Sequence, residues 1–333
     1  MLTTFQNSPS VLMLHNNPLI YQEMLCKTKL NHLHIANEIL VEIIRKGRTP
    51  CNQCYFPSSN KQIDRSQCLI GRIAFSAPKE NHRFKVLSSQ KSEIPVVEAG
   101  TMDEIYDALA ERIVPTSAAA ANPNFKYIVG VAGSPGAGKS TLASEVARRV
   151  NKLWTQRSNA MEFLVNSPEV AISLPMDGFH LYRHQLDKME NPKEAHARRG
   201  APWTFNPASL LQCLQKLRNE GSVCMPSFDH GVGDPVEEDI FVSLQHKVVI
   251  VEGNYLLLEE DIWKDVSSMF DEKWFIEADL DTAMQRVFKR FISEMDLPLD
   301  IAKWRIEYND RPNAELVNKS KRNADLVIRS VSF

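Results

Sequence analysis

The 333-residue chain has no uninterrupted run of about 18 or more apolar residues. A helix needs about 20 such residues to span a bilayer, so we expect no transmembrane helix and no membrane partner. Cysteine is also scarce, with six residues scattered along the chain. So few cysteines in a chain of this length do not make a disulfide scaffold, which favours a reducing, intracellular compartment.

Metal-binding sequence patterns are almost absent too. Cys51 and Cys54 have the spacing of one half of a zinc site, and Cys68 lies nearby. A structural zinc site needs a second pair of ligands, and the sequence offers no clear one. We therefore favour free cysteines over a zinc site.

Acidic residues are rare in residues 1–92, which hold 12 Lys and Arg against 5 Asp and Glu. Residues 93–333 hold 27 Lys and Arg against 36 Asp and Glu, so this part of the chain is acidic. It lacks the overall basic charge expected of a nucleic-acid-binding protein. We expect no nucleic-acid partner. Residues 1–92 show no alternation of strands and helices, apart from one helical pattern over about residues 31–46, and we expect a largely disordered extension.

The composition of this extension leaves its role open. A basic, Ser-rich and acid-poor leader is typical of a transit peptide for a plastid or another organelle. The alternatives are a disordered extension of a cytoplasmic protein or a wrongly assigned start. No signal peptide is predicted, because Met1 is not followed by a basic region and an apolar core.

Ordered structure is expected from about residue 93. Thr101 and Glu104 have the spacing of a capping box, and a helix follows them. Residues 115–123 are small and read as a linker. We therefore predict a lead-in helix and linker over residues 93–123, and a domain over residues 124–333.

An alternation of apolar strand and helix patterns follows the linker. Strands are expected over residues 126–132, 171–175, 246–251, 273–278 and 325–329. Helices are expected over residues 140–153, 207–219, 281–294, 299–307 and 313–320. This alternation predicts a mainly parallel sheet with helices on both faces, and ligands bind at the carboxyl ends of such strands.

The most informative motif follows the first of these strands. It matches the phosphate-binding loop pattern G-x-x-x-x-G-K-[ST], and we expect its residues to bind ATP: Gly133, Ser134, Pro135, Gly136, Ala137, Gly138, Lys139, Ser140 and Thr141. Glycines let the backbone N–H groups approach phosphate oxygens, and Lys139 adds a positive charge beside them. The Ser140 hydroxyl is a ligand for Mg²⁺.

Two carboxylates follow later strands. Asp177 comes after residues 171–175 and could accept a proton from an attacking hydroxyl; an ordinary turn aspartate before Gly178 is the alternative. Glu252 ends a run of β-branched residues, which is the form of a strand whose acid meets Mg²⁺ directly or through water. A structural acid is the competing interpretation there.

Arg286 and Arg290 lie four residues apart on a predicted helix and give it a cationic face. Such arginines can neutralise the charge that builds on a transferring phosphoryl group. A solvated basic face is the alternative. Aromatic, Asp and His residues over 196–205 and 226–235 are expected on loops, where they suit a small polyhydroxylated acceptor; ordinary loop residues are the alternative.

Together these motifs resemble the phosphoribulokinase/uridine kinase/pantothenate kinase family of P-loop kinases. The match rests on Gly-Ser-Pro-Gly-Ala-Gly-Lys-Ser-Thr, Pro-Met-Asp-Gly-Phe-His, Arg-Arg-Gly-Ala-Pro-Trp-Thr-Phe, Val-Glu-Gly-Asn-Tyr and Asn-Asp-Arg-Pro-Asn. The chain looks most similar to a branch with bacterial fructose-kinase-like and fungal uridine-kinase-like proteins. Gly-Phe-His after Asp177 departs from the Ser/Tyr pair typical of uridine kinases.

The resemblance implies a three-layer α/β/α P-loop fold and residue roles. Asp177 would be the catalytic base, assisted by Lys139, Arg286 and Arg290, the last two on a mobile lid, and Ser140 and Glu252 would hold Mg²⁺. Acceptor contacts are expected from His180, Arg198, Arg199, Asp229, His230 and Tyr255. Residues 309–313 would lie near the nucleotide base.

We therefore predict an ATP- and Mg²⁺-dependent kinase that phosphorylates a hydroxyl of a small metabolite, such as uridine or a sugar. One alternative is a regulatory GTPase, but the sequence lacks its Asn-Lys-x-Asp motif. The other is a non-catalytic nucleotide-binding protein, which would be expected to have lost Asp177 or Glu252. Assembly into a homo-oligomer stays open.

Overall fold

The computed structural model describes residues 94–159, 169–229 and 231–331. The predicted helix at 31–46, the three cysteines of the zinc pattern and the transit-peptide hypothesis lie outside these residues. Six strands form one sheet in the order β1-β8-β7-β2-β6-β3, and every neighbouring pair is parallel. These strands are β1 (Val96–Val97), β2 (Tyr127–Ala132), β3 (Ala171–Pro175), β6 (Val248–Glu252), β7 (Glu272–Glu277) and β8 (Leu326–Arg329). The expected parallel sheet is confirmed.

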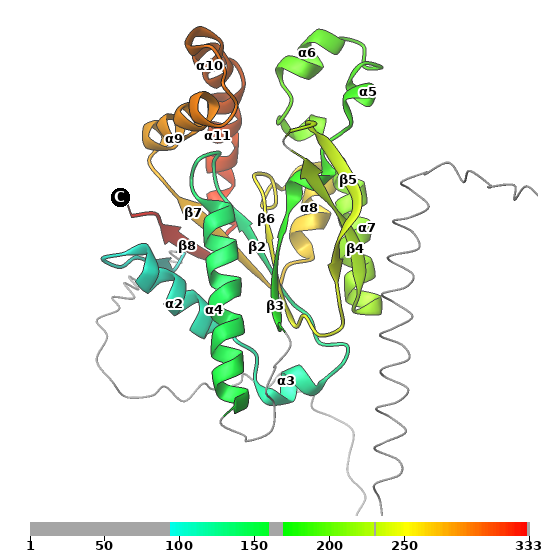
Figure 1. The fold of residues 1–333 in the computed structure, drawn as a ribbon, viewed down its shortest axis with the longest axis vertical. Coiled ribbons are helices and arrows are strands. Elements are labelled where there is room, and N and C mark those ends of the chain that lie inside the picture. The colour runs from blue at the N-terminus through cyan, green and yellow to red at the C-terminus, as the bar shows by residue number, and fades with distance from the viewer. Residues whose placement is uncertain (1–93, 160–168, 230, 332–333) are drawn as a thin grey trace, which may run out of the picture. The chain divides into compact units, whose positions relative to one another are not determined.

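Helices precede, connect and follow the strands (Figure 1). The α-helices are α2 (Met102–Ile113), α3 (Ser117–Ala121), α4 (Lys139–Asn159), α5 (Arg183–Leu186), α6 (Pro192–Ala197), α7 (Pro207–Glu220), α8 (Asp261–Ser268), α9 (Leu280–Ser293), α10 (Leu299–Arg305) and α11 (Arg311–Lys319). The tighter or wider turns are η1 (Met176–Phe179), η2 (Pro202–Thr204), η3 (Ile306–Asp310) and η4 (Ser320–Asn323). No helix in this described part is long and apolar enough to cross a bilayer.

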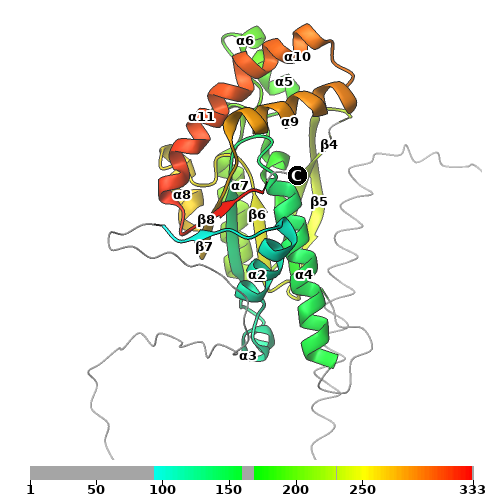
Figure 2. The same cartoon turned by 90° about the vertical axis from the view of Figure 1, so that its left-hand side faces the viewer.

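The sheet is buried on both faces, as the apolar strand sequences predict. Val129 and Val131 of β2 face one apolar cluster, together with residues of α2 and α4. Ile128 and Ala132 of the same strand face a second cluster, which includes residues of α7, α8 and α11. The alternation along β2 therefore separates two helical layers around the sheet, a three-layer α/β/α fold (Figure 2).

The lead-in segment is part of this core. Ile105 and Leu109 of α2 are buried in the cluster shared with α4 and the sheet, and β1 pairs with β8 at the sheet edge. Thr101 Oγ1 accepts a hydrogen bond from the Glu104 N–H, as a capping box requires, but the Glu104 carboxylate turns to the N–H of Gly100 instead. The sequence predicted this helix and missed the short strand before it.

Three expectations about connecting segments were wrong. The linker at 115–123 contains α3, whose first turn is capped by Thr116. Residues 226–235, expected as a loop, belong mostly to an antiparallel hairpin of β4 (Val223–Asp229) and β5 (Asp234–Val242). The helices expected at 299–307 and 313–320 are present as α10 and α11, but the break expected between them is wrong, because the π-helical turn η3 joins α10 to α11.

Helices α9, α10 and α11 form a separate small layer with its own apolar cluster, which includes Met284, Val287 and Ile306. They lie beyond the carboxyl ends of the strands in both views (Figures 1 and 2). The same end of the sheet carries the glycine-rich loop between β2 and α4. The fold therefore brings the glycine-rich loop and the distant helices α9–α11 together at the edge where ligands of such sheets bind.

Candidate active site

The glycine-rich loop has the backbone that a phosphate-binding loop requires. Gly136 and Gly138 have φ angles of 79° and 97°, which favour glycine. A Cβ on Gly136 would also come within 2.3 Å of the Ala283 carbonyl oxygen of α9. The loop therefore needs glycine at residue 136 for its conformation and for its close contact with α9.

Lys139 begins α4 and directs its ammonium group back into the loop, where it donates a 3.1 Å hydrogen bond to the Ser134 carbonyl oxygen. Burial lowers the pKa of this ammonium group, while the charges of Glu252 and Asp177 oppose that shift. A bound polyphosphate would add negative charge at the same place. The loop thus holds a desolvated cation ready for an anion.

Ser140 and Glu252 join the loop to the end of β6. The Ser140 hydroxyl donates a 2.9 Å hydrogen bond to Glu252 Oε1. Burial raises the pKa of Glu252, and the neighbouring Lys139 charge opposes that shift. A hydroxyl beside a carboxylate is the donor set that Mg²⁺ uses when water and phosphate complete its shell, so the two residues fit a magnesium ion.

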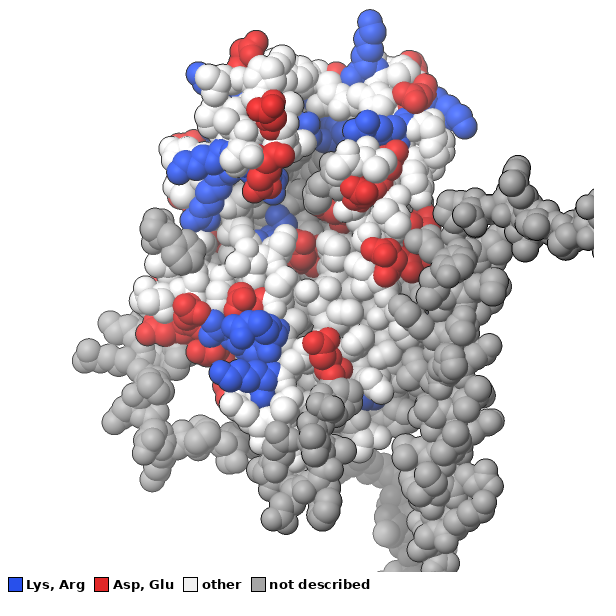
Figure 3. Space-filling view, viewed as in Figure 1, with Lys and Arg blue, Asp and Glu red and all other residues white. Residues whose placement is uncertain are grey.

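A cavity of about 380 Å³ collects the predicted donor-side residues. Its walls include Lys139, Ser140, Asp177, Glu252, Arg286 and Arg290. In Figure 3 the surface is hollowed in this upper part of the molecule, and acidic and basic side chains lie side by side around the hollow. Residues from four separate sequence motifs therefore share one site.

The two arginines of α9 reach this cavity from above the loop. Arg286 Nη1 donates a 3.3 Å hydrogen bond to the Gly136 carbonyl oxygen, and Arg290 lines the same walls one turn further along the helix. Both lie where the sequence predicted a cationic helix face. Their guanidinium groups are near the space that phosphates would occupy above Lys139.

Asp177 stands in η1, immediately after β3. The next residue, Gly178, touches the hairpin so closely that a Cβ would lie 2.1 Å from the Pro226 carbonyl oxygen. His180 Nδ1 lies 2.8 Å from the Asp177 carbonyl oxygen, and its ring packs against Phe205 and Phe228 at centroid distances of 3.9 and 4.7 Å. The turn that holds Asp177 is thus fixed by the hairpin and by an aromatic cluster.

Arg199 is engaged with the protein itself. It donates hydrogen bonds to the carbonyl oxygens of Gly233 and Leu181 and pairs with Asp234 at 2.9 Å. Its guanidinium also lies 5.5 Å from the ring centroid of Phe228. These contacts fasten the hairpin to the segment after η1, so they give Arg199 a structural role besides the predicted acceptor contact.

Arg198 is less constrained than its neighbour. Its guanidinium donates a 3.4 Å hydrogen bond to Asn313 Oδ1 and lies 5.8 Å from the ring centroid of Tyr308, while its buried Nε has no hydrogen-bond partner. It lines a second cavity of about 530 Å³, together with Trp203 and Trp263. This arginine therefore retains donor capacity toward an aromatic-walled space.

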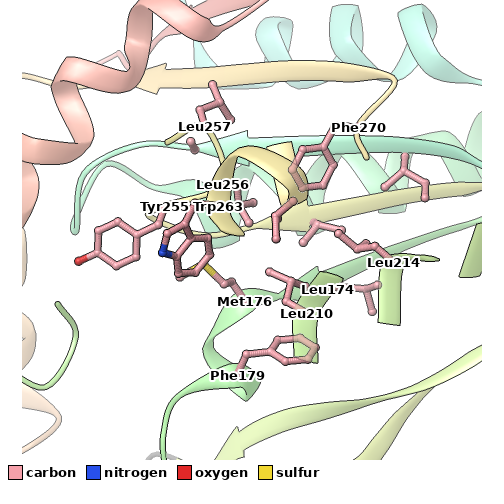
Figure 4. Close-up of a cluster of buried hydrophobic side chains, with 14 of the residues drawn as sticks. Leu174, Met176, Phe179, Leu210, Leu214, Tyr255, Leu256, Leu257, Trp263 and Phe270 are labelled. Carbon is pink, nitrogen blue, oxygen red and sulfur yellow. The ribbon is translucent and has the colours of Figure 1, made fainter. Parts of the chain in front are cut away.

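The remaining predicted acceptor residues lie in different settings. Asp229 Oδ1 accepts hydrogen bonds from the N–H groups of Gly231 and Val232 and so shapes the hairpin turn. His230 falls outside the described residues. Tyr255 is buried in the apolar cluster beside Trp263, and its hydroxyl points out of that cluster (Figure 4) and donates to the Gly200 carbonyl oxygen.

Residues 309–313 contact the segment that contains Arg198 and Arg199. Asn309 Nδ2 donates a 3.0 Å hydrogen bond to the Arg199 carbonyl oxygen, and Asn313 Nδ2 donates to Asn309 Oδ1 at 3.0 Å. Neither lines the cavity around the phosphate loop. Sequence reasoning missed this link and the role of Phe205 and Phe228, because contacts across such distances in sequence leave no local pattern.

Comparisons with known proteins find a matching family model, similar sequences and similar folds. Residues 128–333 match the model of the Phosphoribulokinase / Uridine kinase family. A Schizosaccharomyces pombe protein provisionally named uridine kinase C227.14 is 32% identical over 243 residues, which cover 72% of this chain and 94% of that protein. A crystal structure from Silicibacter sp. TM1040, provisionally described as a fructose transport system kinase, has a TM-score of 0.55 at 27% identity and covers 69% of this chain and 99% of its own. YFH7 from Saccharomyces cerevisiae has the same TM-score at 20% identity, covers 69% of this chain and 98% of its own, and shows a likeness of fold alone.

Proposed function

The chain belongs to the phosphoribulokinase/uridine kinase family, and from this premise we propose that it transfers the γ-phosphoryl group of ATP to a hydroxyl of a small metabolite. The observation that carries the proposal is the single cavity lined by Lys139, Asp177, Glu252, Arg286 and Arg290. It combines the groups that hold a triphosphate with a carboxylate that can serve the attacking hydroxyl.

Asp177 is the base of the proposed reaction. Its carboxylate orients the acceptor hydroxyl and accepts the hydroxyl proton as the new oxygen–phosphorus bond forms and the bond to the ADP oxygen breaks. Lys139 binds the phosphates, and Arg286 and Arg290 stabilise the charge on the transferring group. Ser140 and Glu252 would hold Mg²⁺, which neutralises phosphate charge when bound.

The acceptor side favours a small polyhydroxylated molecule. The buried Phe205 and the ring of Phe228 hold His180 next to Asp177, and a sugar or a nucleoside such as uridine would present its hydroxyls to polar groups of this kind. The names of two relatives refer to uridine and to fructose. These names support a nucleoside or a sugar as the acceptor.

A non-catalytic nucleotide-binding role is the competing proposal, and product analysis separates the two. Purified protein with ATP and Mg²⁺ is tested for ADP formation against a panel of nucleosides, sugars and polyols, and products are identified by mass spectrometry. We expect one acceptor to gain a phosphate. ATP binding without phosphorylation of any panel member, in a protein whose Asp177→Asn variant behaves identically, would favour the non-catalytic role.

A further inference from the structure

Asn254 lines the active-site cavity, and the proposed mechanism does not use it. It follows the end of β6 and shares the cavity walls with Lys139 and Asp177. The residue is half-buried, and no group among the described residues makes a hydrogen bond to its side-chain amide. An amide carries two N–H donors and an oxygen acceptor. Asn254 therefore brings unused hydrogen-bonding capacity to the cavity where phosphoryl transfer is proposed.

The sheet register places Asn254 and Asp177 at equivalent positions. β3 and β6 are neighbouring parallel strands, and both Asp177 and Asn254 come two residues after the paired ends of these strands. The residues in between also meet, since a Cβ on Gly253 would lie 2.5 Å from the Cβ of Met176. Asp177 and Asn254 therefore leave the same edge of the sheet from adjacent strands and line one cavity.

The neighbours of Asn254 favour a contact with the acceptor over a contact with the phosphates. The sheet order is β2-β6-β3, so the end of β6 lies between the phosphate loop, which follows β2, and Asp177, which follows β3. Glu252 is the residue of β6 that meets the loop side, because its carboxylate accepts a hydrogen bond from the first turn of α4. On the other side of Asn254, the Tyr255 hydroxyl donates to the carbonyl oxygen of Gly200, in the segment where acceptor contacts are expected.

We propose that Asn254 is a specificity-determining residue whose side-chain amide hydrogen bonds a second hydroxyl of the acceptor, while Asp177 serves the hydroxyl that is phosphorylated. The inference rests on the proposed kinase function and narrows it to acceptors with at least two hydroxyls. A neutral amide suits this position, because it can donate to or accept from a hydroxyl without adding a third carboxylate beside Asp177 and Glu252. A polyol, a sugar or a nucleoside ribose carries such a pair of hydroxyls, whereas a monohydric alcohol does not.

Paired probes that differ by one hydroxyl test this hydrogen bond. Uridine is compared with 2′-deoxyuridine and 3′-deoxyuridine, D-ribose with 2-deoxy-D-ribose, and D-fructose with 3-deoxy-D-fructose, in wild type and Asn254→Ala. In wild type, removal of the hydroxyl that Asn254 binds should raise KM by about 5-fold or more, the worth of a neutral hydrogen bond. In Asn254→Ala the two members of that pair should have nearly the same KM.

A merely structural role for Asn254 would change KM equally for both members of a pair. Asn318→Ala is the matched control, since Asn318 of α11 is also half-buried and lines neither of the two cavities described above. This control should keep the discrimination of wild type. Discrimination in Asn254→Ala equal to that of wild type, or a wild type that discriminates within no pair, overturns the inference. Asn254→Ser replaces the alanine variant if a melting curve shows that the latter does not fold.

Nucleotide binding provides a second arm that needs no acceptor. Because the proposed contact is with the acceptor, Asn254→Ala should bind Mg²⁺ complexes of ADP and of the non-hydrolysable analogue AMP-PNP as tightly as wild type in isothermal titration. Weaker binding of AMP-PNP with unchanged binding of ADP would assign Asn254 to the γ-phosphate and overturn the inference. Failure of wild type to phosphorylate any probe instead counts against the proposed function, and the nucleotide comparison still decides on which side of the cavity Asn254 acts.

Discussion

The hydroxyl of Ser140 donates a 2.9 Å hydrogen bond to Glu252 Oε1, so the first turn of α4 and the end of β6 meet at one point. The two residues are 112 positions apart in sequence, and the parallel pairing of β2 with β6 brings them together. The hydrogen bond therefore connects the phosphate loop with the acidic end of β6.

The first prediction concerns this pair. Glu252→Gln keeps the size of the side chain and removes its charge, so we expect the Mg²⁺ concentration for half-maximal activity to rise by about 10-fold or more. The measurement is a Mg²⁺ titration of ATP turnover. Glu190→Gln, at an exposed acid, serves as the control and should leave the titration unchanged. An unaltered Mg²⁺ requirement in Glu252→Gln would remove Glu252 from the metal site.

A second prediction concerns Lys139, the half-buried cation of the loop. Lys139→Met should weaken ATP binding strongly, by at least about 10-fold, because the point charge beside the phosphates is lost. Burial disfavours the charged ammonium group in the free protein, so the variant should melt at no lower temperature than wild type. Isothermal titration with ATP and a melting curve measure the two effects. Normal ATP affinity in a folded Lys139→Met protein would contradict the phosphate-loop interpretation.

A third prediction concerns the contact between η1 and the hairpin. Gly178→Ala places a methyl group 2.1 Å from the Pro226 carbonyl oxygen, so the turn carrying Asp177 must move. We expect a loss of about 1–3 kcal/mol in the free energy of unfolding, together with a fall in kcat. Gly100→Ala is the control, because its Cβ would meet only the Glu104 carboxylate at 3.5 Å, an ordinary contact. Urea unfolding should separate the two variants, and equal stabilities would show that the close contact is absent in solution.

The two neighbouring arginines should respond differently to substitution. Arg199→Lys loses the planar fork that reaches Gly233, Leu181 and Asp234 together, so we expect lower stability. Arg198→Lys leaves the hairpin intact and should change mainly the KM for the acceptor. Thermal melting and steady-state kinetics of both variants test this division. Equal loss of stability in the two would assign both arginines to the structure.

Much of the donor half of the site was predictable from sequence. The phosphate loop lies between one strand and one helix, so the local spacing of the sequence is enough to predict Gly133–Thr141. Asp177 and Glu252 were predictable because the carboxyl ends of parallel strands share one sheet edge, and the cavity confirms that they meet there. Arg286 and Arg290 followed from helical periodicity, which places residues four apart on one face.

The acceptor half was less predictable for physical reasons. Pro226 and the Gly and Asp residues after it resemble a loop, yet β4 pairs with β5 across a register shift beside Pro226. Pairing between strands overrides such local propensity. The structural contacts of Arg199 with Leu181 and Asp234 could not be predicted, because these partners come from segments that no spacing rule connects.

In the proposed reaction, Asp177 orients the acceptor hydroxyl beside the γ-phosphate of bound ATP and accepts its proton. The most direct test compares wild type and Asp177→Asn in phosphorylation of the acceptor found by the ATP-consumption screen, with ATP affinity measured in parallel. We predict a fall in kcat of about 10²–10⁴-fold with ATP affinity nearly unchanged, because the carboxylate acts on the acceptor rather than on the nucleotide. Turnover near the wild-type rate in Asp177→Asn would contradict the account.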